Sequence, residues 1–149
     1  MKKRESCRAI IFSKNMLAVM YREKENRVYY TFPGGGMNEN ETMEECVKRE
    51  CFEELGITIS PKREIYTYEN ETTIQHFWLC DWISGEFSTG EGEEFELNNP
   101  KGIYIPVLVD NDRIGKIPLM PPIIATELLN DIEKFGQGLS TKIKKLLDK

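Results

Sequence analysis

Four glutamates (Glu41, Glu50, Glu53 and Glu54) and Arg49 stand at fixed spacings between Gly35 and Ile57, in the run GGMNENETMEECVKRECFEELGI. Glu50, Glu53 and Glu54 lie three or four residues apart, a spacing that puts their carboxylates on one face of a helix. Like charges this close destabilise a helix, and a hard divalent cation such as Mg2+ would offset that cost. The alternative is a solvated acidic helix, although such a helix would intersperse lysines among its glutamates. The spacing therefore predicts a metal site.

The same segment resembles the Nudix box of the Nudix hydrolases (MutT-like enzymes), which is written G-x5-E-x7-R-E-U-x-E-E-x-G-U with U a bulky apolar residue. All of the fixed positions are present, namely Gly35, Glu41, Arg49, Glu50, Glu53, Glu54 and Gly56. Cys51 and Ile57 take the two apolar positions, and Cys51 is smaller than the usual aliphatic residue. The resemblance implies hydrolysis of a phosphoanhydride bond with Mg2+ or Mn2+ as cofactor.

The resemblance also implies roles for single residues. It makes Glu50, Glu53 and Glu54 metal ligands, with the carbonyl of Gly34 as a further one, and it makes Glu53, Glu50 and Arg49 the catalytic set. Arg49 would pair with an acidic partner, either Glu41 or another box glutamate, because its planar fork can hold two carboxylate oxygens. The general base stays open between a box glutamate and a glutamate of a later loop.

That later loop spans residues 84–102 and is long, acidic and rich in glycine. Loops of this kind are often functional. Glu93 and Glu94 are candidates for an extra metal ligand or for the base, together with Glu91 and Glu96. The alternative is a solvated hairpin.

The substrate is specified less well than the metal site. Gly35 and Gly36 would let the backbone approach a ligand closely, and Arg22 and Arg27 would contact phosphate or base unless they are simply solvated. Aromatic residues at 29, 30, 77 and 78 could stack a base, although aromatic side chains in strands more often belong to the core. Relatives that act on ADP-ribose carry a proline where this chain has Thr73. We therefore expect a nucleoside diphosphate linked to another moiety, with a nucleoside triphosphate favoured. The alternative is a non-catalytic Nudix-fold module that binds or senses a nucleotide.

Composition narrows the partners. A net charge of -5 over 149 residues argues against a nucleic-acid groove, which needs a basic footprint. No apolar run is long enough to span a membrane. Four cysteines without C-x-x-C spacing indicate free thiols in a reducing cytoplasm. His76 is the only histidine and lies inside an expected strand, which favours a structural role. The expected partner is a small-molecule nucleotide, and a homodimer is left open.

Periodicity predicts the elements that must position the box. Strands are expected near residues 5–13, 16–22, 28–32, 57–68, 72–83 and 103–109, and helices at 43–55 and from 121 onward. Thr42 and Glu45 form a capping-box pattern, Gly56 suits a helix end, and residues 47, 51 and 55 should face the core. The glycines at 34–36 are expected to break regular structure. The sequence thus predicts one α+β domain over residues 1–149, which family resemblance makes the Nudix α/β/α sandwich with a mixed β-sheet between helices.

Overall fold

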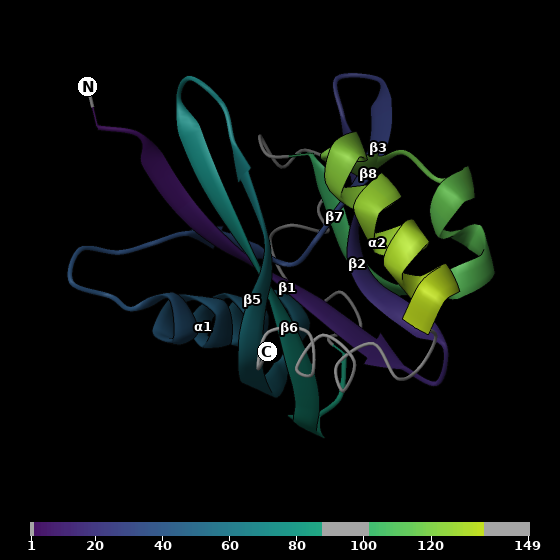
Figure 1. Ribbon diagram of the computed structural model, residues 1–149, viewed down its shortest axis with the longest axis horizontal. Helices are drawn as coiled ribbons and strands as arrows, with labels where there is room; N and C mark the ends of the chain where they lie inside the picture. Colours follow the sequence, from purple (N-terminus) through teal and green to yellow (C-terminus); the bar gives the residue numbers. More distant parts are fainter. Residues whose placement is uncertain (1, 88–101, 136–149) are drawn as a thin grey trace.

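The described part of the chain folds into strands, two α-helices and a short 3-10 helix (Figure 1). The computed structural model describes residues 2–87 and 102–135. Within them the elements are β1 (Arg4–Ser13), β2 (Met16–Lys24), β3 (Arg27–Thr31), β4 (Gly34–Gly36), α1 (Met43–Leu55), β5 (Ile57–Glu69), β6 (Thr73–Gly85), β7 (Ile103–Asp110), the 3-10 helix η2 (Asn111–Lys116), β8 (Leu119–Met120) and α2 (Pro122–Phe135). The main strands and both helices begin and end within a few residues of the positions that periodicity predicts.

The sheet is mixed and is organised around β1. Its strand order is β5-β6-β1-β2-β3-β8, with β4 paired to β1 and β7 paired to β2. Strand β1 runs parallel to β6 and antiparallel to β2 and β4. Because β4 carries the glycines that begin the box, this pairing fixes the box against the centre of the sheet.

The helices cover opposite faces of this sheet. Along β1, Cys7, Ala9 and Ile11 pack in the cluster that contains the buried face of α1, whereas Ile10 packs in the cluster that contains α2. This alternation is the period of two that a strand imposes on its side chains. Figure 1 shows α1 and α2 well apart, with the strands between them. The structure confirms an α+β fold in which a mixed sheet lies between helices.

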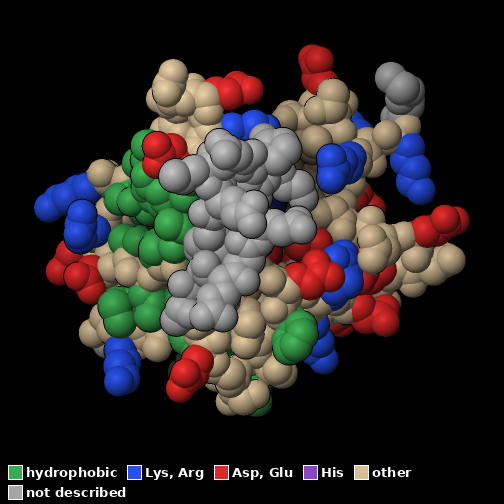
Figure 2. All heavy atoms as spheres, turned by 180° about the vertical axis from the view of Figure 1, so that it is seen from behind, with side chains coloured by type: hydrophobic (Ala, Val, Ile, Leu, Met, Phe, Trp, Pro, Cys, Tyr) green, Lys and Arg blue, Asp and Glu red, His purple; other side chains and the backbone are tan. Residues whose placement is uncertain are grey.

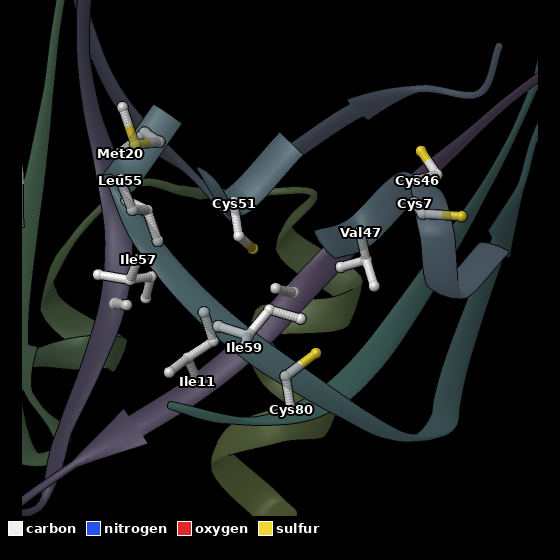
Figure 3. Close-up of a cluster of buried hydrophobic side chains, with 12 residues drawn as sticks. Cys7, Ile11, Met20, Cys46, Val47, Cys51, Leu55, Ile57, Ile59 and Cys80 are labelled. Atoms are coloured by element: carbon white, nitrogen blue, oxygen red, sulfur yellow. The ribbon is translucent and has the colours of Figure 1, made fainter. Parts of the chain in front are cut away.

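The caps and the buried face of α1 agree with the sequence. The Thr42 hydroxyl accepts from the backbone N–H of Glu45 at 3.1 Å, and the Glu45 carboxylate accepts from the N–H of Thr42 at 2.9 Å. Gly56 ends the helix with φ 73°, in the left-handed region. The buried side chains of α1 are Cys46, Val47, Cys51 and Leu55, which Figure 3 shows pointing into one apolar cluster with residues of the strands.

The glycine segment differs from its expected turn. Gly34–Gly36 form a short strand whose residues pair with β1, with Gly34 opposite Arg8 and Gly36 opposite Ser6. Gly34 has φ 147°, and a Cβ there would lie 2.1 Å from the carbonyl oxygen of Cys7. Only glycine allows the two backbones to approach this closely. The short η2 and β8 were also not predicted, because neither is long enough to show a period.

Helix α2 and the cysteines also contribute to the core. Ile124 and Leu128 of α2 are buried, and Leu129, Ile132 and Phe135 pack against the same cluster. All four cysteines are buried free thiols. Among the described residues, no helix is both long and apolar enough to cross a bilayer.

Candidate active site

Arg49 on α1 connects the helix to the glycine strand and to the segment before the helix. Its Nε donates to Glu41 Oε2 at 2.7 Å and its Nη2 donates to Glu41 Oε1 at 3.0 Å, so both carboxylate oxygens are held. Nη2 also donates to the carbonyl of Gly36 at 3.0 Å. The hydrogen bonds from Arg49 lower the pKa of Glu41 to about 2. Of the alternatives that the sequence left open, Glu41 is therefore the main partner.

Glu50 lies against the backbone of the glycine strand. Its side chain is 15% exposed, and its Oε1 accepts from Arg49 Nη1 at 2.9 Å. A Cβ on Gly35 would lie 2.6 Å from the Glu50 carboxyl carbon. A side chain at position 35 would therefore take the space that the carboxylate occupies, so glycine here creates a place for an acidic group.

Glu54 and Glu53 have different surroundings on the same helix face. Glu54 accepts from the backbone N–H of Gly34 at 2.6 Å and shares a hydrogen bond with the Tyr104 hydroxyl. Burial raises the pKa of Glu54 to about 7, against the opposing effect of those hydrogen bonds. Glu53 is 57% exposed and lies 3.4 Å from Arg49 Nη1. The helix thus presents two partly buried carboxylates, Glu50 and Glu54, and one exposed carboxylate, Glu53.

The oxygen atoms of the site suit a hard divalent cation as ligands, although the carboxylates here accept hydrogen bonds from Arg49 and from the Gly34 N–H. Carboxylates and a backbone carbonyl are the ligand types that Mg2+ prefers, and the glycine strand leaves room for Glu50 beside them. In the described part of the chain, no three His, Cys, Asp or Glu side chains converge as a ready metal-binding group. Arg49 holds Glu50 and Glu53, and the Gly34 N–H holds Glu54. Glu50, Glu53, Glu54 and the Gly34 carbonyl remain the predicted ligands.

A row of three side chains crosses the sheet next to this site. Arg22 on β2 lies directly opposite Tyr29 of β3 and Tyr104 of β7 in the strand register. The Arg22 guanidinium carbon is 4.5 Å from the centre of the Tyr104 ring and 5.7 Å from that of Tyr29. Tyr104 also shares a hydrogen bond with Glu54. The Tyr104 side chain therefore connects Arg22 to one of the predicted carboxylates.

Other candidates lie farther from the chemistry or have structural roles. Arg27 is exposed near the turn between β2 and β3, with its guanidinium 5.5 Å from the Tyr29 ring. Phe77 is fully buried in the core. His76 of β6 is buried, with Glu64 of β5 2.6 Å from its Nδ1 and Glu5 of β1 3.2 Å from its Nε2. It therefore links three neighbouring strands, which is a structural role. Glu93 and Glu94 lie outside the described residues.

Sequence reasoning missed two residues of this site. Tyr104 is not among the residues that the sequence predicts for the site, yet its hydroxyl reaches Glu54. The alternation in β7 would place Tyr104 and Leu108 on one face, but only the strand register shows that this face meets Arg22. Arg8 is partly buried and donates to the carbonyls of Phe32 and Gly34. No local pattern signals this role, because it depends on the pairing of β1 with β4.

The surface drawn in Figure 2 carries both signs of charge. On that face the described Lys and Arg side chains lie among Asp and Glu side chains. This mixture accords with the net charge of -5.

The sequence model of the NUDIX domain matches residues 2–103, more than half of the chain. No curated protein shows a significant match in sequence. Solved structures similar to this chain include MutT, described for Aliivibrio salmonicida and Vibrio cholerae (17% identity, 87% of this chain and 98% of that one, TM-score 0.67). An ADP-ribose pyrophosphatase from Streptococcus suis is also similar (20% identity, 80% of this chain and 81% of that one, TM-score 0.60). So is a UDP-X diphosphatase (15% identity, 93% of this chain and 66% of that one, TM-score 0.64). At these identities the likeness supports the fold, and together with the match to the domain model it shows that the chain belongs to the Nudix family.

Proposed function

We propose that this protein is a metal-dependent pyrophosphohydrolase that cleaves a phosphoanhydride bond in a nucleoside diphosphate linked to another moiety. A nucleoside triphosphate is the form we favour. The observation that carries the proposal is the placement of Glu50 and Glu54 against the glycine strand, with Arg22 close by. The similar structures include MutT, an ADP-ribose pyrophosphatase and a UDP-X diphosphatase, and these proteins support the reaction class.

The residues of the site fall into three groups: those that would bind the metal, Arg22, which would bind phosphate, and those that hold the site in place. Glu50, Glu53, Glu54 and the Gly34 carbonyl would hold Mg2+ or Mn2+. When bound, the cation would neutralise charge on the diphosphate and polarise a phosphoryl oxygen. Arg22 supplies a fixed positive charge whose flat guanidinium suits phosphate. It is oriented by the rings of Tyr29 and Tyr104.

Support comes from Arg49 and from the glycines. Arg49 keeps α1 at a fixed distance from β4 through Glu41 and Gly36. Gly35 and Gly36 remain the proposed point where a polyphosphate would approach the backbone. Glu53 and Glu50 are the proposed catalytic carboxylates. Glu93 and Glu94 remain proposed alternatives for an extra ligand or for the base.

The test measures phosphate and pyrophosphate release from a panel of nucleotides and nucleotide conjugates. Each reaction contains Mg2+ or Mn2+ and is repeated with EDTA. Glu53→Gln is compared with Glu44→Gln, a matched change on an exposed residue of the same helix. We expect EDTA and Glu53→Gln to abolish turnover and Glu44→Gln to preserve it.

Two other outcomes would change the proposal. Nucleotides that raise the melting temperature without any turnover would support the binding-module alternative. Turnover that survives EDTA would contradict metal dependence.

Four buried free thiols support a reducing cytoplasm as the location. A homodimer stays a prediction that sedimentation would test.

A further inference from the structure

Arg8 lies at the point where β1 meets the glycine strand. Its residue pairs with Gly34 in the register of β1 and β4. Its Nη1 donates to the carbonyl of Phe32 at 3.2 Å and to the carbonyl of Gly34 at 3.0 Å. Both bonds come from one nitrogen, so Arg8 links the two carbonyls on either side of Pro33. The direction of the Gly34 carbonyl is thereby coupled to a side chain of the central strand.

Gly34 is held from both sides by opposite charges. Its N–H donates to the Glu54 carboxylate at 2.6 Å, and its carbonyl accepts from the Arg8 guanidinium at 3.0 Å. A Cβ on Gly34 would lie 2.7 Å from Arg8 Cα and 2.9 Å from Arg8 Cδ. The Arg8 side chain therefore lies flush against this glycine, and no other residue type at position 34 would leave it there.

Arg8 also lies within electrostatic range of the carboxylates of the site. Burial lowers the pKa of its guanidinium, the negative charges of Glu54 and Glu50 oppose that shift, and the positive charge of Arg22 adds to it. The contact that links Arg8 to the predicted metal ligands is its hydrogen bond to the Gly34 carbonyl.

We propose that Arg8 is a positioning residue for the metal centre, which fixes the Gly34 carbonyl so that this oxygen ligand is in place before a cation binds. This inference rests on the proposed function, since it needs the metal site. A carbonyl oxygen has two lone pairs, so Gly34 can accept from Arg8 and still face a ligand. Removing an outer partner of this kind lowers metal affinity by about 10-fold to 100-fold.

The test compares Arg8→Lys with Arg4→Lys. A lysine keeps the charge, but its ammonium lies one covalent bond closer to the backbone than Nη1, so it falls short of the carbonyls. Arg4 is a matched control, because it lies on the same strand and reaches another glycine of β4, Gly36, but is exposed. Mn2+ affinity is measured by the electron paramagnetic resonance signal of free Mn2+, on protein whose fold circular dichroism has verified.

We expect Arg8→Lys to weaken Mn2+ binding by about tenfold or more, with Arg4→Lys within about twofold of the wild type. Folded Arg8→Lys that binds Mn2+ as tightly as the wild type would overturn the inference and leave the proposed function standing. Absence of Mn2+ binding by the wild type would instead contradict the proposed function, and this inference with it.

A measurement on the wild type keeps the proposal testable if Arg8→Lys does not fold. Mg2+ is titrated while nuclear magnetic resonance follows the Gly34 carbonyl carbon and the Arg8 guanidinium nitrogens. We expect both to shift with the same Mg2+ midpoint, because they share a hydrogen bond. A Gly34 carbonyl that responds while the Arg8 guanidinium does not would overturn the inference.

Discussion

Replacing Arg49 by lysine should destabilise the protein although the charge is kept. Arg49 uses the planar fork of its guanidinium to hold both oxygens of Glu41, one oxygen of Glu50 and the Gly36 carbonyl. A lysine has a single ammonium with three donors, which cannot reach these separated acceptors together. The partners are well enclosed, with Glu41 12% and Glu50 15% exposed, so water replaces the lost bonds poorly.

The expected size follows from the bonds that are lost. Hydrogen bonds to charged groups contribute about 1.5–3 kcal/mol each, and a lysine would keep one or two of the four. Arg49 itself is 26% exposed, which lets water offset part of the loss. We therefore expect Arg49→Lys to lower the free energy of unfolding by about 2–4 kcal/mol.

Urea unfolding followed by circular dichroism measures this change, with Lys48→Arg on the neighbouring exposed position as control. A double-mutant cycle with Glu41→Gln should give a coupling energy of about 1–3 kcal/mol. A loss below about 0.5 kcal/mol in Arg49→Lys, the range of ordinary surface changes, would refute the role given to the fork.

Three further predictions concern charge and space. The hydrogen bonds from Arg49 lower the pKa of Glu41 to about 2, so the stability that ionised Glu41 contributes is present above the ordinary pKa of 4.5 and is lost as pH falls toward 2. In urea unfolding, the difference in free energy of unfolding between wild type and Glu41→Gln should therefore shrink from pH 4.5 to pH 2. A difference that stays constant over this range would contradict the prediction. Burial lowers the pKa of His76, but its hydrogen bonds to Glu64 and Glu5 outweigh burial and raise the pKa above 6.5. The advantage of wild type over His76→Gln should therefore be largest below pH 6.5 and fall as pH rises through the raised pKa, and an advantage that grows with pH would contradict the sign. Gly34→Ala should cost about 3 kcal/mol or more in the same assay, from strain and overlap with the Cys7 carbonyl, and a cost no larger than that of Gly36→Ala, whose Cβ would meet only the flexible Arg4 side chain, would argue against this packing.

The parts of the fold that sequence predicted are those with a local signal. Helix α1 follows from its capping box, its apolar face and Gly56, because each of these acts within a turn or two of its own position. The long strands follow from alternation. The short β4 and β8 carry no period, since two or three residues cannot show one, and they form only because β1 and β3 pair with them.

In the candidate site, too, the features with a local signal could be predicted from the sequence and those that depend on distant residues could not. The spacing of residues 50, 53 and 54 placed their side chains on one helix face. The family resemblance left the partner of Arg49 open between Glu41 and another box glutamate, and the structure shows Glu41 as the main one. The environment of each carboxylate could not be predicted. Glu54 is enclosed by Tyr104 from β7 and by Gly34 from β4, which are distant in sequence. Arg8 belongs to the site for the same reason.

Phosphate and pyrophosphate release from nucleoside triphosphates and diphosphate conjugates should be followed first, as Mg2+ is removed and restored. We expect turnover with Mg2+, none after EDTA, and full recovery when Mg2+ is added in excess. Turnover that continues in EDTA, or none on any nucleotide with either Mg2+ or Mn2+, would rule out metal-dependent hydrolysis.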